Sequence, residues 1–124
     1  MKRITMKRIT IYLTISIFLL SCDPSKDGLE PINTGNTVVT QGLDFIPDLI
    51  NCNVGDTVFF ELTPSHNAVQ VSEATYQNNG GTPLDGGFNI DYGQSGYFVP
   101  ESSGTYYYVC QPHLPGMKAR IIVQ

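Results

Sequence analysis

The sequence has little histidine, no tryptophan and few basic residues. It contains two His, no Trp and seven Lys or Arg among 124 residues. Four of the basic residues lie within the first eight positions, so the rest of the chain sets three basic residues against 11 acidic ones, a formal charge of −8. Such a surface repels phosphate backbones, which argues against nucleic acid as a partner. The lack of Trp is unfavourable to a role in adhesion or sugar binding.

Long helical patterns are also missing. No stretch beyond residue 37 keeps a helical period for three turns, whereas 12 Gly and 8 Pro indicate many turns between short strands. A chain of 124 residues is long enough for one domain and a leader, but too short for two domains with separate cores. We therefore predict an all-β protein, a two-sheet Greek-key β-sandwich of seven or eight strands.

The pattern around Gly55 predicts a hairpin. Ile50, Cys52 and Val54 alternate with polar residues before the Gly55-Asp56 turn, and an apolar stretch over residues 57–62 follows directly. We expect these two strands to pair with each other.

The second half of the chain divides into a loop region and two strong strands. Residues 77–96 hold six glycines and predict long loops around one short strand near residues 88–90. Residues 104–110 and 119–123 are rich in aromatic and β-branched residues, which predicts strands. Tyr106 resembles the tyrosine corner of sandwich proteins, so we assign it a structural role.

The first residues have the order expected of an export signal. A basic end precedes an apolar run over residues 9–20, which stops at Ser21 and Cys22 and is short for a membrane-spanning helix. The junction resembles a bacterial lipobox, so we predict a signal peptide over residues 1–21, lipidation of Cys22 and a flexible linker over residues 22–36. We expect an exported cell-envelope protein, lipid-anchored and facing the periplasm or the cell exterior. An ordinary secretory signal is the alternative, and it also exports the chain.

Four residues of matching chemical type stand out: His66, Cys110, His113 and Met117. A thiolate and two imidazoles bind copper in both oxidation states, and a thioether is the weak fourth ligand of blue-copper sites. The two His are the only ones in the chain, so a single copper ion has one possible ligand set. This number excludes a multicopper oxidase, and the single Cys between residues 109 and 117 excludes a binuclear copper centre.

The role of Cys52 leaves an alternative open. We interpret Cys52 as a small buried hydrophobic residue. A disulfide between Cys52 and Cys110 is the rival, because export exposes thiols to oxidation, and it would abolish the copper site. A further alternative is that Cys110 is also no more than a buried apolar residue.

Several segments carry a family resemblance. Residues 109–117 (VCQPHLPGM) resemble the ligand loop of plastocyanins, amicyanins and pseudoazurins, and residues 64–69 (PSHNAV) are similar to the upstream His-Asn segment of these proteins. Residues 45–47 and 55–58 also resemble early strands of the family, so the match runs over residues 37–124. The resemblance implies a cupredoxin domain over residues 37–124 with one type 1 copper ion.

The resemblance also implies roles for neighbouring residues. Asn67 would tie the two ligand loops together by hydrogen bonds. Pro112 has no N–H to donate to the thiolate, which favours a higher reduction potential. Leu114 and Pro115 would form an apolar rim around His113, the exit for the electron. Three residues separate the second His from Met117, whereas plastocyanins have four and amicyanins two.

These features imply a one-electron shuttle and not an enzyme. The carboxylates are scattered, with no close pair beside a candidate base, so little remains for catalysis. We expect a monomer that docks briefly with a redox partner such as a cytochrome or a reductase on the same membrane. The alternatives are a copper-handling lipoprotein, for delivery or storage, and a metal-free β-sandwich that serves as a binding module.

Overall fold

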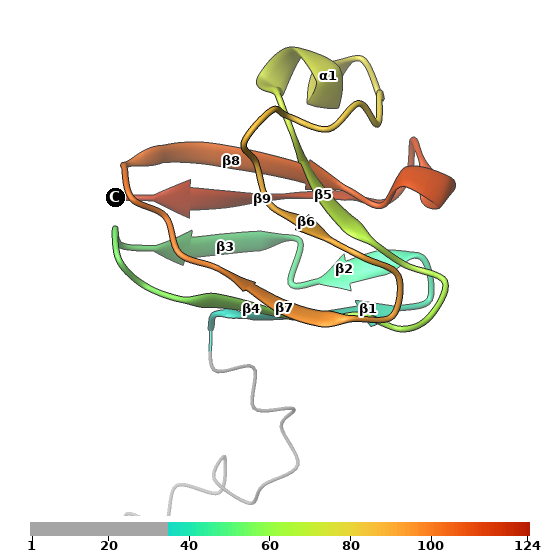
Figure 1. The fold of residues 1–124 in the computed structure, drawn as a ribbon, viewed down its shortest axis with the longest axis horizontal. Helices are drawn as coiled ribbons and strands as arrows, with labels where there is room; N and C mark the ends of the chain where they lie inside the picture. Colours follow the sequence, from blue (N-terminus) through green and yellow to red (C-terminus); the bar gives the residue numbers. More distant parts are fainter. Residues whose placement is uncertain (1–34) are drawn as a thin grey trace, which may run out of the picture. The chain divides into compact units, whose positions relative to one another are not determined.

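Two β-sheets face each other in residues 35–124, the part of the chain that the computed structural model describes (Figure 1). One sheet has the strand order β2-β1-β4-β7 and the other β3-β9-β8-β5-β6. The strands are β1 (Thr37–Gln41), β2 (Asp44–Ile46), β3 (Leu49–Cys52), β4 (Val58–Glu61), β5 (Ala68–Val71), β6 (Asn89–Ile90), β7 (Ser95–Phe98), β8 (Gly104–Val109) and β9 (Lys118–Val123). The helices are α1 (Glu73–Gln77) and the short 3₁₀ helix η2 (Gln111–His113). The predicted all-β, two-sheet Greek-key sandwich is confirmed, with nine strands instead of seven or eight.

The predicted signal peptide, the lipidated Cys22 and residues 22–34 of the linker lie outside the described residues. Within residues 35–124, no helix has the length and apolar character needed to cross a bilayer.

The hairpin predicted across Gly55 is wrong. β3 pairs in parallel with β9, whereas β4 pairs with β1 and β7 in the other sheet. Gly55 has a φ of 88°, and its N–H donates to the carbonyl of Pro100 at 2.9 Å, so the turn carries the chain from one sheet to the other. An alternating pattern indicates which side chains face the core, but it does not specify the partner strand.

The predicted loop region contains more regular structure than expected. β6 lies where one short strand was predicted, but β7 begins inside the same segment and α1 ends at its start. α1 is capped by Ser72, whose hydroxyl accepts a hydrogen bond from the Thr75 amide at 3.1 Å. A helix of five residues is too short to show a period, so only this capping signal could have revealed it.

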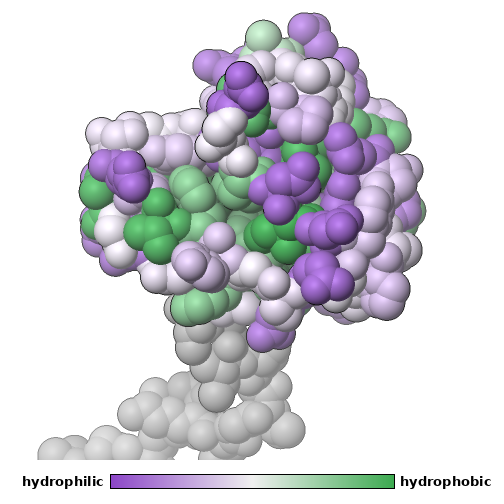
Figure 2. Space-filling view, viewed as in Figure 1, coloured by the Kyte–Doolittle hydropathy of each residue, from purple (hydrophilic) through white to green (hydrophobic). Residues whose placement is uncertain are grey.

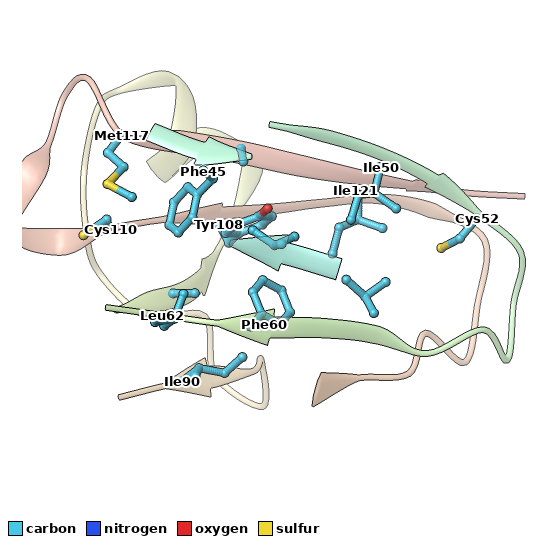
Figure 3. Packing of buried hydrophobic residues seen from close by; sticks show 14 of the residues in the cluster. Phe45, Ile50, Cys52, Phe60, Leu62, Ile90, Tyr108, Cys110, Met117 and Ile121 are labelled. Atoms are coloured by element: carbon cyan, nitrogen blue, oxygen red, sulfur yellow. The ribbon is translucent and has the colours of Figure 1, made fainter. Parts of the chain in front are cut away.

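The core lies between the sheets and is rich in aromatic rings (Figure 3). Tyr108 is completely buried, with its ring 4.9 Å from that of Phe45 and 5.4 Å from that of Phe60, in edge-on contacts. Cys110 and Cys52 belong to the same core but lie at opposite ends of it in Figure 3. Both are free thiols, so the structure contradicts the alternative of a disulfide between Cys52 and Cys110.

A second buried cluster lies on the outer face of the five-stranded sheet. Val69, Val71 and Val109 are buried but do not belong to the central core. α1 lies against β8 on this side of the sheet, as Figure 1 shows. The strand β5 is therefore covered on both faces, which explains why all four of its residues are buried.

Replacing Tyr108 with Phe is expected to stabilise the domain. The Tyr108 hydroxyl is buried without a hydrogen-bond partner among residues 35–124, and burial raises its pKa well above the usual range. Since an unsatisfied buried hydroxyl costs about 1 kcal/mol or more, we expect the free energy of unfolding to rise by about 1 kcal/mol. Denaturant titration of both proteins measures the difference.

Tyr106→Phe is the matched control. The Tyr106 hydroxyl donates to the carbonyl of Ser102 at 2.8 Å, as expected of a tyrosine corner, so its removal should lower the free energy of unfolding by about 1 kcal/mol. A loss of stability in Tyr108→Phe equal to that in Tyr106→Phe would show that the Tyr108 hydroxyl is satisfied.

Candidate metal centre

Three donor side chains converge at one end of the sandwich. His66 precedes β5, Cys110 follows β8, and His113 ends η2. The Cys110 Sγ lies 3.7 Å from Nδ1 of His66 and 3.2 Å from Nδ1 of His113. One ligand atom from each residue lies within 4.8 Å of the others, so a single ion can reach all three.

Strand pairing brings the two halves of this group together. β5 and β8 are antiparallel neighbours, with Val69 opposite Val109, so the start of β5 and the end of β8 lie at the same end of the sheet. His66 and Cys110 are the residues just beyond those ends, although 44 positions separate them in the chain. Figure 1 shows η2 at this end of the sandwich.

Backbone hydrogen bonds close the loop between Cys110 and Met117. The Cys110 amide donates to the Met117 carbonyl at 3.0 Å, and the Met117 amide donates to the His113 carbonyl at 3.1 Å. The His113 amide donates in turn to the Cys110 carbonyl at 3.2 Å. These bonds make residues 110–117 a tight loop that brings its first and last residues together.

Met117 is placed beside the same group of donors. Its side chain is 1% exposed and belongs to the central core. Figure 3 shows Met117 at the end of the core where Cys110 lies. The thioether is therefore positioned as the fourth donor that the sequence predicted.

Burial favours the uncharged forms of the donors. Burial raises the pKa of the Cys110 thiol, while backbone hydrogen bonds with Asn67 and His113 act in the opposite direction. Burial also lowers the pKa of His66, the nearby His113 lowers it further, and a hydrogen bond with the backbone of Gly42 opposes this shift. A neutral imidazole is ready to bind a metal, and a cation bound at the sulfur would favour loss of the thiol proton. The donor set therefore fits a soft metal ion.

Asn67 connects the two segments that carry the donors. Its Nδ2 donates to Oε1 of Gln111 at 2.9 Å, and its Oδ1 accepts from the Gln111 amide at 2.9 Å. The segment of His66 is thus fastened to the residue that follows Cys110. Pro112 lies in η2 and is exposed, and it has no N–H to donate.

The donors differ in their access to solvent. Cys110 and His66 are buried, whereas His113 and Leu114 are half-buried and Pro115 is exposed. Among the four donors in the described part of the chain, His113 is therefore the one with the greatest access to solvent.

Two attachments between the ends of this loop and the segment that begins with α1 were not predicted from the sequence. The Gln111 side chain donates through Nε2 to the carbonyl of Gly81 at 2.7 Å. Lys118 donates through Nζ to the carbonyl of Tyr76 at 2.8 Å. Gln111 lies inside the predicted ligand-loop motif, but no motif marks Lys118 or Gly81, because the importance of these two residues comes from contacts between segments that lie far apart in the chain.

Comparison with known proteins places this centre in a family. The family model of copper binding proteins, the plastocyanin/azurin family, matches residues 32–124. The chain belongs to this family. Its cofactor is accordingly a single type 1 copper ion, and His66, Cys110, His113 and Met117 are positioned as the ligands.

Solved structures of this family share the sandwich. Pseudoazurin from Sinorhizobium meliloti is 26% identical, with a TM-score of 0.56 over 71% of this chain and 72% of that chain. Pseudoazurin from Hyphomicrobium denitrificans is also 26% identical, with a TM-score of 0.55 over 71% of this chain and 73% of that one. Amicyanin from Paracoccus versutus is 20% identical, with a TM-score of 0.54 over 74% of this chain and 83% of the other, and shows likeness of fold alone. No curated protein sequence is significantly similar to this one.

Proposed function

We propose that this cupredoxin is a one-electron carrier of a bacterial cell envelope. The observation that carries the proposal is the unequal burial of the donors: Cys110 and His66 are 0% and 4% exposed, whereas His113 is half-buried. Bound copper supplies a change of one electron between its two oxidation states. A shielded centre with a single accessible edge can exchange an electron while it keeps water and small molecules away from the donors.

The surrounding residues hold the donors in place. The paired hydrogen bonds between Asn67 and Gln111 and the close packing of Met117 in the core restrict movement of the ligand loop. A loop that cannot relax lets the site change oxidation state with little rearrangement. The exposed Pro112 contributes no hydrogen bond to the sulfur, and fewer such bonds favour a higher reduction potential.

The side of His113 is the docking surface in this proposal. Leu114 and Pro115 provide a small apolar rim there, of the kind that suits brief contacts. The face seen in Figure 2 mixes hydrophobic and hydrophilic residues. The formal charge of −8 beyond the first eight residues favours a basic partner, such as a cytochrome or a reductase.

We infer that the carrier works at a membrane surface as a monomer. In this proposal, residues 1–21 are removed on export, Cys22 carries a lipid, and residues 22–36 link the lipid to the domain that starts at residue 37. The tether would confine the carrier and its partner to one surface and so raise their encounter rate.

Electron self-exchange between two copies of the copper-loaded domain tests the docking surface without a partner. We expect Leu114→Asn to lower the self-exchange rate about tenfold, since loss of one apolar contact costs about 1.4 kcal/mol. The absorption spectrum should not change, because Leu114 supplies no donor. Line broadening in NMR spectra of mixed oxidation states measures the rate.

Leu84→Asn is the matched control, because Leu84 is 39% exposed and lies outside the ligand loop. Its self-exchange rate should equal that of the wild type. Equal rates in all three proteins would show that the electron does not pass near Leu114. Poor reversibility in voltammetry combined with fast copper release to a chelator would favour copper handling instead.

A further inference from the structure

The residues that directly follow the first and the last copper donor of the loop both attach to one neighbouring segment. Gln111 follows the thiolate donor, and its Nε2 donates to the carbonyl of Gly81 at 2.7 Å. Lys118 follows the thioether donor, and its Nζ donates to the Tyr76 carbonyl at 2.8 Å and to Oδ1 of Asn79 at 2.9 Å. All three acceptors belong to the end of α1 and the turn after it.

We propose that residues 73–81 form a strap, a positioning element that holds both ends of the donor loop, residues 110–117, in the shape that binds copper. The strap contributes no ligand, and it acts through Gln111 and Lys118. The proposal rests on the copper site described above, but it does not require that the protein transfer electrons.

The first attachment fixes the side chain next to the thiolate. The Gln111 carboxamide accepts from Asn67 through Oε1 and donates to Gly81 through Nε2, so both ends of the group are used. Gly81 approaches the loop so closely that a Cβ there would lie 3.1 Å from Cδ1 of Leu114 and 3.3 Å from Cγ of Gln111. The strap therefore lies directly against the ligand loop at this end.

The second attachment fixes the residue next to the thioether. The Lys118 ammonium lies 4.2 Å from the centre of the Tyr76 ring, and that ring lies 4.8 Å from the ring of Tyr107 on β8. Asn79 has a φ of 57°, a left-handed conformation that Asn tolerates better than most residues. Two uncharged oxygens and an aromatic face thus hold the ammonium, which gives it a fixed position.

A loop held at both ends loses little conformational freedom when it binds a metal. Partners that orient metal ligands from outside typically change metal affinity by about ten- to 100-fold when they are removed. We therefore expect the strap to control how fast copper leaves the site. The strap should also protect the loop from opening when no metal is bound.

Two substitutions each remove one attachment and leave the rest of the structure in place. Gln111→Glu keeps an oxygen that accepts from Asn67 but loses the donor to Gly81. Lys118→Met keeps an unbranched apolar chain like the aliphatic part of lysine but loses the ammonium. We expect each to raise the rate of copper release to a chelator about tenfold, the lower end of the range for such partners. Lys118→Arg keeps the charge and the donors and should remain close to the wild-type rate.

The double variant tests whether the strap acts as one unit. If residues 73–81 hold both ends together, loss of one attachment already frees the loop, so Gln111→Glu with Lys118→Met should release copper little faster than the faster single variant. Rates that multiply in the double variant would show two independent contacts and would overturn the proposal.

Tyr106→Phe serves as the control for stability, because it removes a hydrogen bond to Ser102 that does not involve the loop. We expect it to lower the free energy of unfolding without faster copper release. If it accelerates release as much as Gln111→Glu does, the effect is general destabilisation and the strap is excluded.

Amide hydrogen exchange in the metal-free chain gives a readout that does not depend on copper. The amides of Cys110 and Met117 close the loop through hydrogen bonds of 3.0 and 3.1 Å. We expect both to exchange about tenfold faster in Gln111→Glu and Lys118→Met than in the wild type, as for copper release. Unchanged exchange of these amides would overturn the strap, whereas a wild type that binds copper but shows no reversible voltammetric response would overturn only the proposed function.

Discussion

Cys110→Ser is expected to abolish the blue colour of the copper-loaded protein. The colour of a type 1 site arises from charge transfer between the thiolate and copper, and a hydroxyl is a harder donor that stays protonated. Cys110 is completely buried between two imidazoles, so no other group can replace the sulfur. We expect complete loss of the charge-transfer band. Copper affinity should fall by more than about 100-fold, the largest loss typical when a residue that only orients a metal ligand is removed. Absorption and electron paramagnetic resonance spectra measure both.

Cys52→Ser is the matched control, since it makes the same chemical change at the other end of the core (Figure 3). Cys52 is 7% exposed and far from the donors, so colour and copper binding should remain. A buried hydroxyl should lower the free energy of unfolding by about 1 to 3 kcal/mol. A blue Cys110→Ser protein, or a colourless Cys52→Ser protein, would contradict the assignment of the ligand.

The copper site was largely predictable because its chemistry is local in the sequence. Cys110, His113 and Met117 lie in one short segment, and only one other His exists to complete the set. If a single copper ion binds, these residues therefore allow one ligand set, while the disulfide alternative for Cys110 needed the structure to decide it. The resemblance also predicted that Asn67 ties the two ligand loops together by hydrogen bonds, and the structure shows two hydrogen bonds between Asn67 and Gln111.

The partners of individual strands were not predictable in the same way. The pattern at Ile50 and Cys52 indicated a strand correctly, but β3 pairs with β9 from the far end of the chain. A turn at Gly55 is compatible both with a hairpin and with a crossing between sheets, and in the structure its amide donates to the carbonyl of Pro100, a residue far along the chain. Such a contact has no signal in the local sequence.

The contacts of the strap with the copper site were likewise not predictable from the sequence. Gly81 and Asn79 lie in a stretch rich in Gly and Asn, which indicates a loop but not what the loop touches. Lys118 is one of two basic residues near the start of β9, and nothing in the pattern distinguishes it from an ordinary exposed lysine. The function of these residues depends on tertiary contacts, which the sequence does not display.

Met117→Leu is expected to keep both copper and colour while the reduction potential rises. The three stronger donors remain, and Leu has a similar volume, so the buried position at 1% exposure is still filled. The substitution removes one donor and makes the surroundings of the ion more apolar, and both changes disfavour the higher charge of the oxidised ion, so the reduced state gains. For a one-electron couple, a tenfold change in the ratio of the affinities for reduced and oxidised copper corresponds to about 59 mV, and we expect the potential to rise by about this amount. Voltammetry measures the potential.

Ile121→Leu on β9 controls for repacking of the core, because Ile121 is completely buried and supplies no donor. Its potential should equal that of the wild type. An unchanged potential in Met117→Leu would show that the thioether does not contact copper at all. Complete loss of copper from Met117→Leu would show that the thioether is an indispensable ligand. The sulfur of Cys110 and the two imidazoles would then not be sufficient to hold the ion.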